Sequence, residues 1–366
     1  MMKLGEKELK DIANGACLLA SGGGGTNQAP EWIIPEILKI AAHVDLIGLD
    51  EVTPKTSGAV AVCMGSPLAL KQIGFHGSVF RAWDLLEQTL DRKFAFAVPG
   101  EIGSVNTLIA MLTAVKKGIP ALDADGSGRA VPTLSMTTYA QPIPISPFTL
   151  ANEAASTFHE PDARAVLYGK TPADIENMAR PFISVPGEFD QTGGVAGWAM
   201  KQKDLTTKNP LIWGTVTKAR DVGRALRKYQ DPMEALHSAL GKDVSLIIRG
   251  KLTRIVQAAS GGFDRGVLTF EDGKKTIHVV NQNENMIAWD AGTSCPVAMA
   301  PDGIGYVNKK GRALSNADIQ EGDKVYVVGI RAQERLRTDT YLKAQFLTGL
   351  KNVGYYGKYV PIENLS

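Results

Sequence analysis

Apolar residues in the first 140 positions alternate between two spacings. Apolar residues three and four positions apart predict helices over residues 9–20, 31–41, 79–90 and 105–112. Short apolar runs predict strands between these helices, at 46–49, 58–64, 94–98 and 121–122. Short buried strands that alternate with amphipathic helices are typical of a parallel sheet covered by helices. We therefore expect an α/β domain with a mostly parallel sheet and flanking helices.

The pattern changes beyond residue 140. Residues 141–147 contain Pro142, Pro144 and Pro147, which exclude a helix and predict an extended connector. Helices are predicted after this connector, and short strands dominate from residue 244 onward, with a hairpin turn at 271–274. We therefore predict two domains, with the α/β domain over 1–160 and a mixed domain, helical at first and then β-rich, over 161–366.

Composition narrows the class of protein. The chain has 366 residues, of which 44% are hydrophobic, and a formal net charge of +2 that argues against a dedicated nucleic-acid binder. No apolar run reaches the ~18 residues of a membrane span, and the polar start is not a secretory signal. Three cysteines cannot build a disulfide framework. We expect a soluble, cytoplasmic protein without nucleic-acid or membrane partners; the sequence leaves a homo-oligomer open.

Ser21 is followed by four consecutive glycines, Gly22, Gly23, Gly24 and Gly25. The run follows a predicted helix rather than a strand and lacks the Lys-Ser/Thr of a phosphate-binding P-loop. One interpretation is a flexible helix terminator, because glycine commonly ends helices. The other is a binding loop whose backbone N–H groups converge on a substrate, which glycine permits by allowing close approach.

Polar side chains follow two of the predicted strands at their carboxyl ends. One strand runs into Glu101 and Asn106, and another runs into Asp123, Asp125 and Arg129. Because the crevice of an open α/β sheet lies beyond the carboxyl ends of its strands, we expect these side chains to meet at one rim. Neighbouring carboxyl groups raise one another's pKa, so that one can hold a proton while another accepts one. In the alternative interpretation, the two aspartates cap the following helix and pair with the arginine.

Weaker candidates lie elsewhere. Cys63 stands near a strand end and could face the crevice as a nucleophile. The amide-rich stretch 281–285 follows a predicted strand and either forms turns or supplies donors to a polar ligand. The five histidines show no paired metal-ligand spacing, so no cofactor is predicted and any metal ligands stay unknown. The carboxylates would still allow a divalent metal to replace a general base.

Six segments together resemble the S-methyl-thiohydantoin desulfurase family, which is associated with hydantoinase and oxoprolinase systems. These segments are Ser21–Gly25, Glu101–Asn106, Gly118–Ala130, Asn283–Met286, Pro301–Ile304 and Gly322–Val325. The Asp-x-Asp-Gly-x-Gly-Arg-Ala stretch that begins at Asp123 is the most specific. Two positions depart from the pattern: Ser104 stands where a glycine is expected, and Thr133 stands where the family tends to carry a glutamate.

The resemblance implies hydrolysis of a carbon–sulfur bond in a 2-methylthio-imidazolone ring, which gives a hydantoin and methanethiol. In this scheme Asp123 or Asp125 activates water, and Glu101 donates a proton to the ring or to the departing sulfur. Asn106 and Arg129 orient the ring or an attached carboxylate. The amides of the glycine run, Gly22 to Gly25, stabilise charge that develops on the ring.

Two other functions fit the same residues. The chain could be a non-catalytic small-molecule binding or regulatory partner of a hydantoinase- or oxoprolinase-type enzyme. It could also be a metal-dependent cyclic amidohydrolase that opens a hydantoin-like ring. A binding protein would be stabilised by its ligand without turning it over. A metal-dependent amidohydrolase would lose its activity when a chelator is added.

Overall fold

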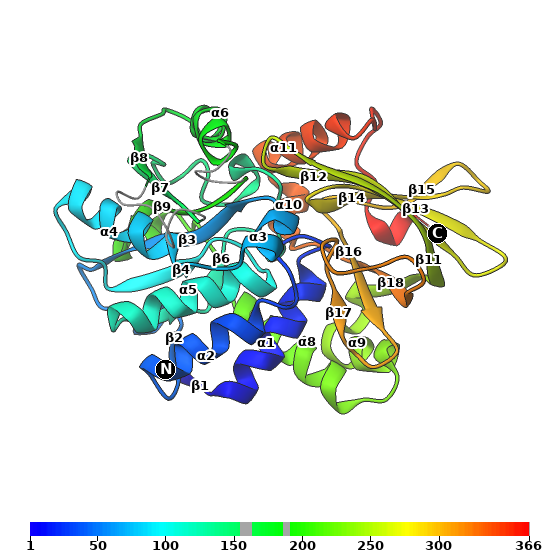
Figure 1. Ribbon diagram of the computed structural model, residues 1–366, viewed down its shortest axis with the longest axis horizontal. Coiled ribbons are helices and arrows are strands. Elements are labelled where there is room, and N and C mark those ends of the chain that lie inside the picture. Colours follow the sequence, from blue (N-terminus) through cyan, green and yellow to red (C-terminus); the bar gives the residue numbers. More distant parts are fainter. Residues whose placement is uncertain (154–162, 186–190, 366) are drawn as a thin grey trace.

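Two eight-stranded sheets, with helices packed on and between them, make up the computed structural model, which describes residues 1–153, 163–185 and 191–365 (Figure 1). The first sheet, with its helices, lies on the left in Figure 1, and the second sheet lies on the right. The expected α/β architecture followed by a β-rich region is confirmed.

The first sheet is mixed. Its strands run in the order β1 (Met2–Leu4), β2 (Val44–Ile47), β5 (Ala121–Leu122), β4 (Phe96–Pro99), β3 (Ser57–Gly65), β9 (Thr192–Lys201), β7 (Phe148–Asn152) and β8 (Arg164–Leu167). The four strands from β2 to β3 in this order are parallel, and the remaining pairs are antiparallel. Strands β8 and β9 complete this sheet although they follow residue 160 in the chain.

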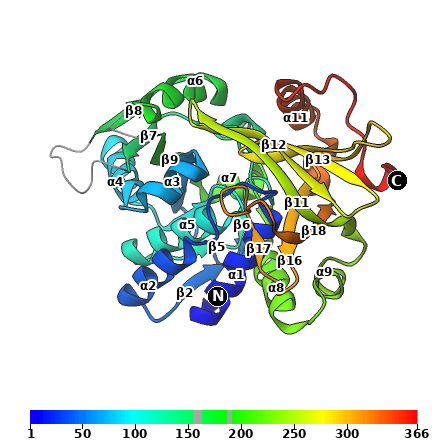
Figure 2. The ribbon, with the colours of Figure 1, turned by 45° about the vertical axis from the view of Figure 1, so that its right-hand side comes forward.

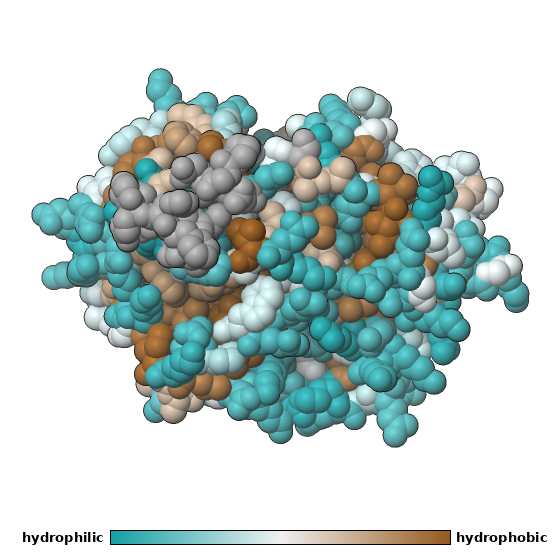
Figure 3. Space-filling model, viewed as in Figure 1, coloured by the Kyte–Doolittle hydropathy of each residue, from teal (hydrophilic) through white to brown (hydrophobic). Residues whose placement is uncertain are grey.

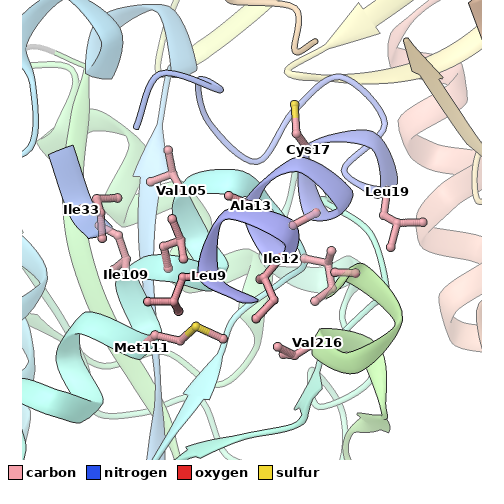
Figure 4. Close-up of a cluster of buried hydrophobic side chains, with 14 of the residues drawn as sticks. Leu9, Ile12, Ala13, Cys17, Leu19, Ile33, Val105, Ile109, Met111 and Val216 are labelled. Atoms are coloured by element: carbon pink, nitrogen blue, oxygen red, sulfur yellow. The ribbon is translucent and has the colours of Figure 1, made fainter. Parts of the chain in front are cut away.

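The helices in this part of the chain pack on the first sheet or on one another. They are α1 (Glu6–Leu19), α2 (Pro30–Ile40), α3 (Pro67–Ile73), α4 (Ser78–Leu90), α5 (Ser104–Lys117), α6 (Pro172–Ile183), α7 (Gln202–Thr207), α8 (Thr215–Lys228) and α9 (Pro232–Leu240). Apolar side chains of α1, α2, α5 and α8 form one buried cluster (Figure 4). Helices α1 and α8 approach very closely: a methyl group on Gly15 would lie 1.8 Å from the carbonyl oxygen of Ala219. Helix α1 is thereby held firmly where it leads into the glycine run.

The second sheet is antiparallel throughout. Its strands run in the order β15 (Cys295–Met299), β14 (Glu284–Asp290), β13 (Thr276–Gln282), β12 (Phe263–Glu271), β11 (Val244–Ser260), β18 (Lys324–Ile330), β16 (Gly303–Asn308) and β17 (Ala313–Leu314). Phe270 pairs with Ile277 across the turn at 271–274, so the predicted hairpin is confirmed. Helices α10 (Glu334–Thr338) and α11 (Thr340–Asn352) follow the sheet, and α11 packs against β14.

The two sheets meet along α1 and the loop that follows it. Helix α1 contacts β16 and β17 of the second sheet as well as α8 (Figure 2). A small two-stranded sheet, β6 (Ala124–Asp125) with β10 (Ile212–Trp213), lies beside the first sheet. Hydrophilic side chains cover most of the face in Figure 3, with smaller apolar areas between them. None of the helices in the described ranges is long and apolar enough to cross a membrane.

Candidate functional site

A cavity opens where the two sheets meet, and residues from both sheets line it. Its walls come from β3, β9, the loop between β4 and α5, the loop at 131–137 and the start of β14. Polar and aromatic residues in this lining include Cys63, Glu101, Asn106, Thr133, Tyr139, Arg180, Trp198, Asn283 and Glu284, and Gly24 and Gly25 line it as well.

Glu101 lies just after β4, at the carboxyl end of a parallel strand. Its carboxylate accepts hydrogen bonds from the Nδ2 of Asn106 at 2.6 Å and from the backbone N–H of Val131 at 2.8 Å. Burial raises the pKa of Glu101 to about 7; these two hydrogen bonds oppose the shift. A carboxyl group with this pKa can take up or release a proton near neutral pH.

Asn106, in the first turn of α5, is fixed in one orientation. Its Oδ1 accepts a hydrogen bond from the backbone N–H of Cys63 at 3.1 Å, which turns its Nδ2 toward Glu101. A side-chain amide held at both ends presents a donor, and not an acceptor, to the glutamate. Asn106 therefore favours the ionised form of Glu101.

Glu284, the first residue of β14, brings a second carboxyl group to the cavity from the other sheet. Only 3% of the residue is exposed, and its Oε2 has no hydrogen-bond partner among the described residues. Burial raises the pKa of Glu284 well above its usual range, and the charge of Glu101 raises it further, while Arg129 opposes the shift. Burial therefore favours the protonated form of Glu284 over its anion.

Glu101 and Glu284 form a carboxyl pair whose members differ in their surroundings. Glu101 has two hydrogen-bond donors that favour its anion, whereas Glu284 has a buried oxygen without a partner. When two carboxyl groups influence each other in this way, their ionisations are coupled. The carboxyl group that is better solvated or better hydrogen-bonded loses its proton first. The pair thus consists of Glu101, whose anion is hydrogen-bonded, and Glu284, whose protonated form burial favours.

The glycine run joins the two sheets and then enters the cavity. The carbonyl oxygens of Ser21 and Gly22 accept hydrogen bonds from the backbone N–H groups of Asn285 and Asn316. A methyl group on Gly23 would lie 1.9 Å from Oε1 of Glu284, so only glycine leaves room for that carboxyl group.

Of the four glycines, Gly24 and Gly25 line the cavity, and Gly22 and Gly23 do not. The N–H groups of Gly24 and Gly25 have no acceptor within the described part of the chain. The run is therefore more than a helix terminator, because two of its residues line the cavity.

Asp123 and Asp125 lie outside the cavity lining. Asp123 accepts hydrogen bonds from the backbone N–H and the hydroxyl of Thr217, and so caps α8. Asp125 accepts hydrogen bonds from the N–H groups of Ser127 and Gly128 within its own turn. Burial raises the pKa of Asp125 to about 6, and its charge in turn raises the pKa of Glu101. Of the predicted rim, the structure brings Glu101 and Asn106 to the cavity and gives both aspartates partners elsewhere.

Arg129 also lies outside the cavity lining. Its guanidinium donates to the carbonyl oxygens of Pro301 at 2.7 Å and Asp302 at 2.9 Å, both in the second domain. Burial lowers its pKa to about 10, so it stays charged at neutral pH. No ion pair with Asp123 or Asp125 forms in the described part of the structure. Arg129 fastens the turn that carries it to the second domain and influences the carboxyl pair through its charge.

Several cavity residues were not among the predicted site residues. Glu284 lies inside the amide-rich stretch 281–285, and that stretch was the available signal for a polar ligand. Tyr139 and Trp198 carried no signal, because a single aromatic residue in a sequence is most often part of the core. Thr133 lines the cavity, so this departure from the family pattern falls in the site itself.

Cys63 lines the cavity, as its place near a strand end suggested. Burial raises the pKa of its thiol well above the usual range, and the charge of Glu153 adds to the effect. A thiol held protonated is a poor nucleophile. Among the described residues, no group of three or more His, Cys, Asp or Glu is arranged to hold a metal ion.

These features define a two-domain α/β protein with a ligand cavity that contains a carboxyl pair at the junction of its domains. The sequence matches the S-Me-THD-like N-terminal domain over residues 7–159 and the S-Me-THD-like C-terminal domain over residues 170–362. The chain therefore belongs to the S-Me-THD-like family.

A solved structure shares this fold over the whole chain. The crystal structure of a structural-genomics target protein from Chromobacterium violaceum superposes with a TM-score of 0.84 at 29% sequence identity. The similarity covers 99% of this chain and 100% of that protein. None of the curated proteins is similar enough to match this chain.

Proposed function

We propose that this protein hydrolyses the carbon–sulfur bond of an S-methyl-thiohydantoin-like ring and releases a hydantoin and methanethiol. One observation carries the proposal: two buried carboxyl groups with different surroundings, Glu101 and Glu284, line a single cavity between the two sheets. Membership of the S-Me-THD-like family supports the same substrate class.

The reaction needs a base and an acid in turn. As the oxygen of a water molecule bonds to the ring carbon that carries the methylthio group, Glu101 takes a proton from that water. Glu284 gives its proton to the ring nitrogen that is double-bonded to this carbon. The carbon–sulfur bond then breaks, and the departing sulfur takes the proton that Glu101 holds. At the same time the new hydroxyl group gives its proton to Glu284 and becomes the carbonyl group of the hydantoin. One water is consumed, nothing is oxidised or reduced, and both carboxyl groups regain their starting states.

Backbone donors complete the scheme. The free N–H groups of Gly24 and Gly25 are suited to hold the oxygen or nitrogen atoms of the ring on which negative charge develops. Asn106 keeps Glu101 ionised and oriented for the proton transfer. This proposal gives the role of base to Glu101, which the sequence had suggested as a proton donor, and assigns no direct role to Asp123 or Asp125.

The test is turnover of an S-methyl-thiohydantoin by the purified protein. Methanethiol is measured with a thiol reagent, and formation of the hydantoin is followed by chromatography. We expect both products in equal amounts from the wild type and a loss of about 10²-fold or more in kcat for Glu284→Gln. Glu87→Gln is the matched control, because Glu87 is a buried glutamate on α4 that pairs with Lys93 outside the cavity; it should retain the wild-type rate.

The outcome also separates the other two functions. Stabilisation by the ring without release of thiol would overturn the proposal in favour of a binding protein. Opening of a hydantoin ring without release of thiol, abolished by a chelator, would overturn it in favour of a cyclic amidohydrolase. Full turnover in a folded Glu284→Gln variant would exclude this carboxyl group as the acid.

A further inference from the structure

Trp198 combines three features that a core tryptophan does not need. It lines the cavity, it is 1% exposed, and its Nε1 has no hydrogen-bond acceptor among the described residues. Trp83 and Trp213 also have an Nε1 without an acceptor in the part of the chain described, but neither lines the cavity. An unpaired buried donor is unfavourable, and of these three only Trp198 lies at this cavity, within reach of a ligand bound there.

The backbone at Trp198 is held in an unfavourable conformation. Its φ is +46°, in the left-handed region that bulky side chains rarely adopt. Here the pairing of β9 with β3 shifts register between Gly58 and Val60, so that β9 carries an irregularity opposite them. Irregularities of this kind re-aim a side chain, and such strain is concentrated at functional sites.

Two aromatic rings hold the indole in place. The ring of Tyr139 lies 4.6 Å from that of Trp198, tilted by 58°, and the ring of Phe148 lies 5.8 Å away, edge-on at 87°. Tyr139 is itself anchored, because its hydroxyl donates to the carbonyl oxygen of Gly100, the residue before Glu101. The indole is thus fixed relative to the strand end that carries the proposed base.

We infer that Trp198 is a specificity-determining residue whose Nε1–H donates a hydrogen bond to an acceptor atom of a bound planar heterocycle. The inference rests on the proposed function and narrows its substrate class to rings that carry a carbonyl oxygen or an unprotonated ring nitrogen. In this arrangement Trp198 positions the ring, and the two carboxyl groups carry the proton transfers.

Trp198→Phe tests the inference, because phenylalanine keeps an aromatic ring and removes the N–H. With an S-methyl-thiohydantoin as substrate, we expect KM to rise about tenfold, the effect of one lost hydrogen bond, with a smaller change in kcat. Trp83→Phe is the matched control, since it removes an equally buried and unpaired N–H away from the cavity; its KM should equal that of the wild type. A folded Trp198→Phe variant with the wild-type KM overturns the inference.

A second measurement needs no active variant. Wild-type protein with ¹⁵N-labelled tryptophan has five indole N–H signals, one for each tryptophan, and these are assigned by the signals that single Trp→Phe variants lose. Titration with hydantoin, the proposed product ring, should move the Trp198 signal downfield and leave the Trp83 signal in place. If the Trp198 signal does not move at saturating hydantoin, the inference about Trp198 is wrong, but the proposed function is not affected. A wild type that neither releases methanethiol nor binds hydantoin overturns the proposed function and this inference with it.

Discussion

Two neighbouring strands of the first sheet, β4 and β5, run in parallel into carboxylate-bearing turns, but the two turns differ in what their carboxylates contact. Asp125 takes its hydrogen bonds from Ser127 and Gly128 in its own turn, and Asp123 caps a helix. Glu101 takes its hydrogen bonds from the side chain of Asn106 and the backbone of Val131, and it faces the cavity.

This difference in hydrogen-bond partners distinguishes carboxylates that stabilise the fold from carboxylates that are available to a ligand. A carboxylate satisfied by the backbone that follows it stabilises its own turn and has no lone pairs directed at a ligand. A carboxylate held from one side by another segment keeps a free side for substrate. Glu284 represents the extreme case, because its Oε2 has no partner within the described chain.

The largest expected effect is in the comparison of Glu101 with Asp123. Glu101→Gln should lower kcat for methanethiol release by about 10²- to 10⁴-fold, because it removes the base and keeps the shape. Asp123→Asn should retain most of the wild-type rate, since the amide still accepts a hydrogen bond from Thr217. Equal losses in the two folded variants would mean that both strand ends are catalytic.

An intermediate effect is expected where the glycine run meets Glu284. Gly23→Ala places a methyl group on the space of the Glu284 carboxyl group and should displace it, so we expect kcat to fall by about 10²-fold. The same overpacking should lower the free energy of unfolding by about 1–3 kcal/mol, measured with urea. Gly48→Ala is the control, because a methyl group there meets no atom within 4 Å. A Gly23→Ala variant with the wild-type kcat would contradict the role given to Glu284.

The smallest effect concerns Asp125 and appears in the pH profile. The negative charge of Asp125 raises the pKa of Glu101, so Asp125→Asn should lower that pKa from its value of about 7. In the proposed scheme Glu101 is the base, so the acidic limb of kcat/KM should move to lower pH, with turnover retained above neutral pH. The shift is checked against Asp123→Asn, which should leave the limb in place. Loss of turnover at every pH in a folded Asp125→Asn variant would return Asp125 to the catalytic set.

Local rules were enough to find one side of the site. Glu101 and Asn106 follow a short apolar strand and begin a helix, and the crevice of an α/β sheet lies at such strand ends, so their place could be predicted. The same rule also selected Asp123 and Asp125, because it does not say which carboxylate finds hydrogen bonds within its own turn. The glycine run allowed two interpretations, a helix terminator and a binding loop, and its sequence does not say which two of its residues line the cavity.

The other side of the site depends on contacts between distant segments. Glu284 and Trp198 reach the cavity because the second sheet docks on the glycine run and because β9 inserts beside β3 with a shifted register. Neither event leaves a periodic pattern around those residues. A buried acid in an amide-rich stretch and a single tryptophan in a strand look the same in a sequence whether they fill a core or face a ligand.

The spacing of apolar residues determined the fold class, since helix and strand periods are local properties of the chain. It also placed the glycine run and Glu101 at ends of elements, where chemistry can occur. Tertiary structure alone determines the pKa of each carboxyl group and which N–H donors lack a partner. Both depend on burial and on the hydrogen-bond partners that every surrounding segment supplies. For that reason we propose Glu101 as the base and Glu284 as the acid and give Asp125 no direct role, although all three are simply carboxylates in the sequence.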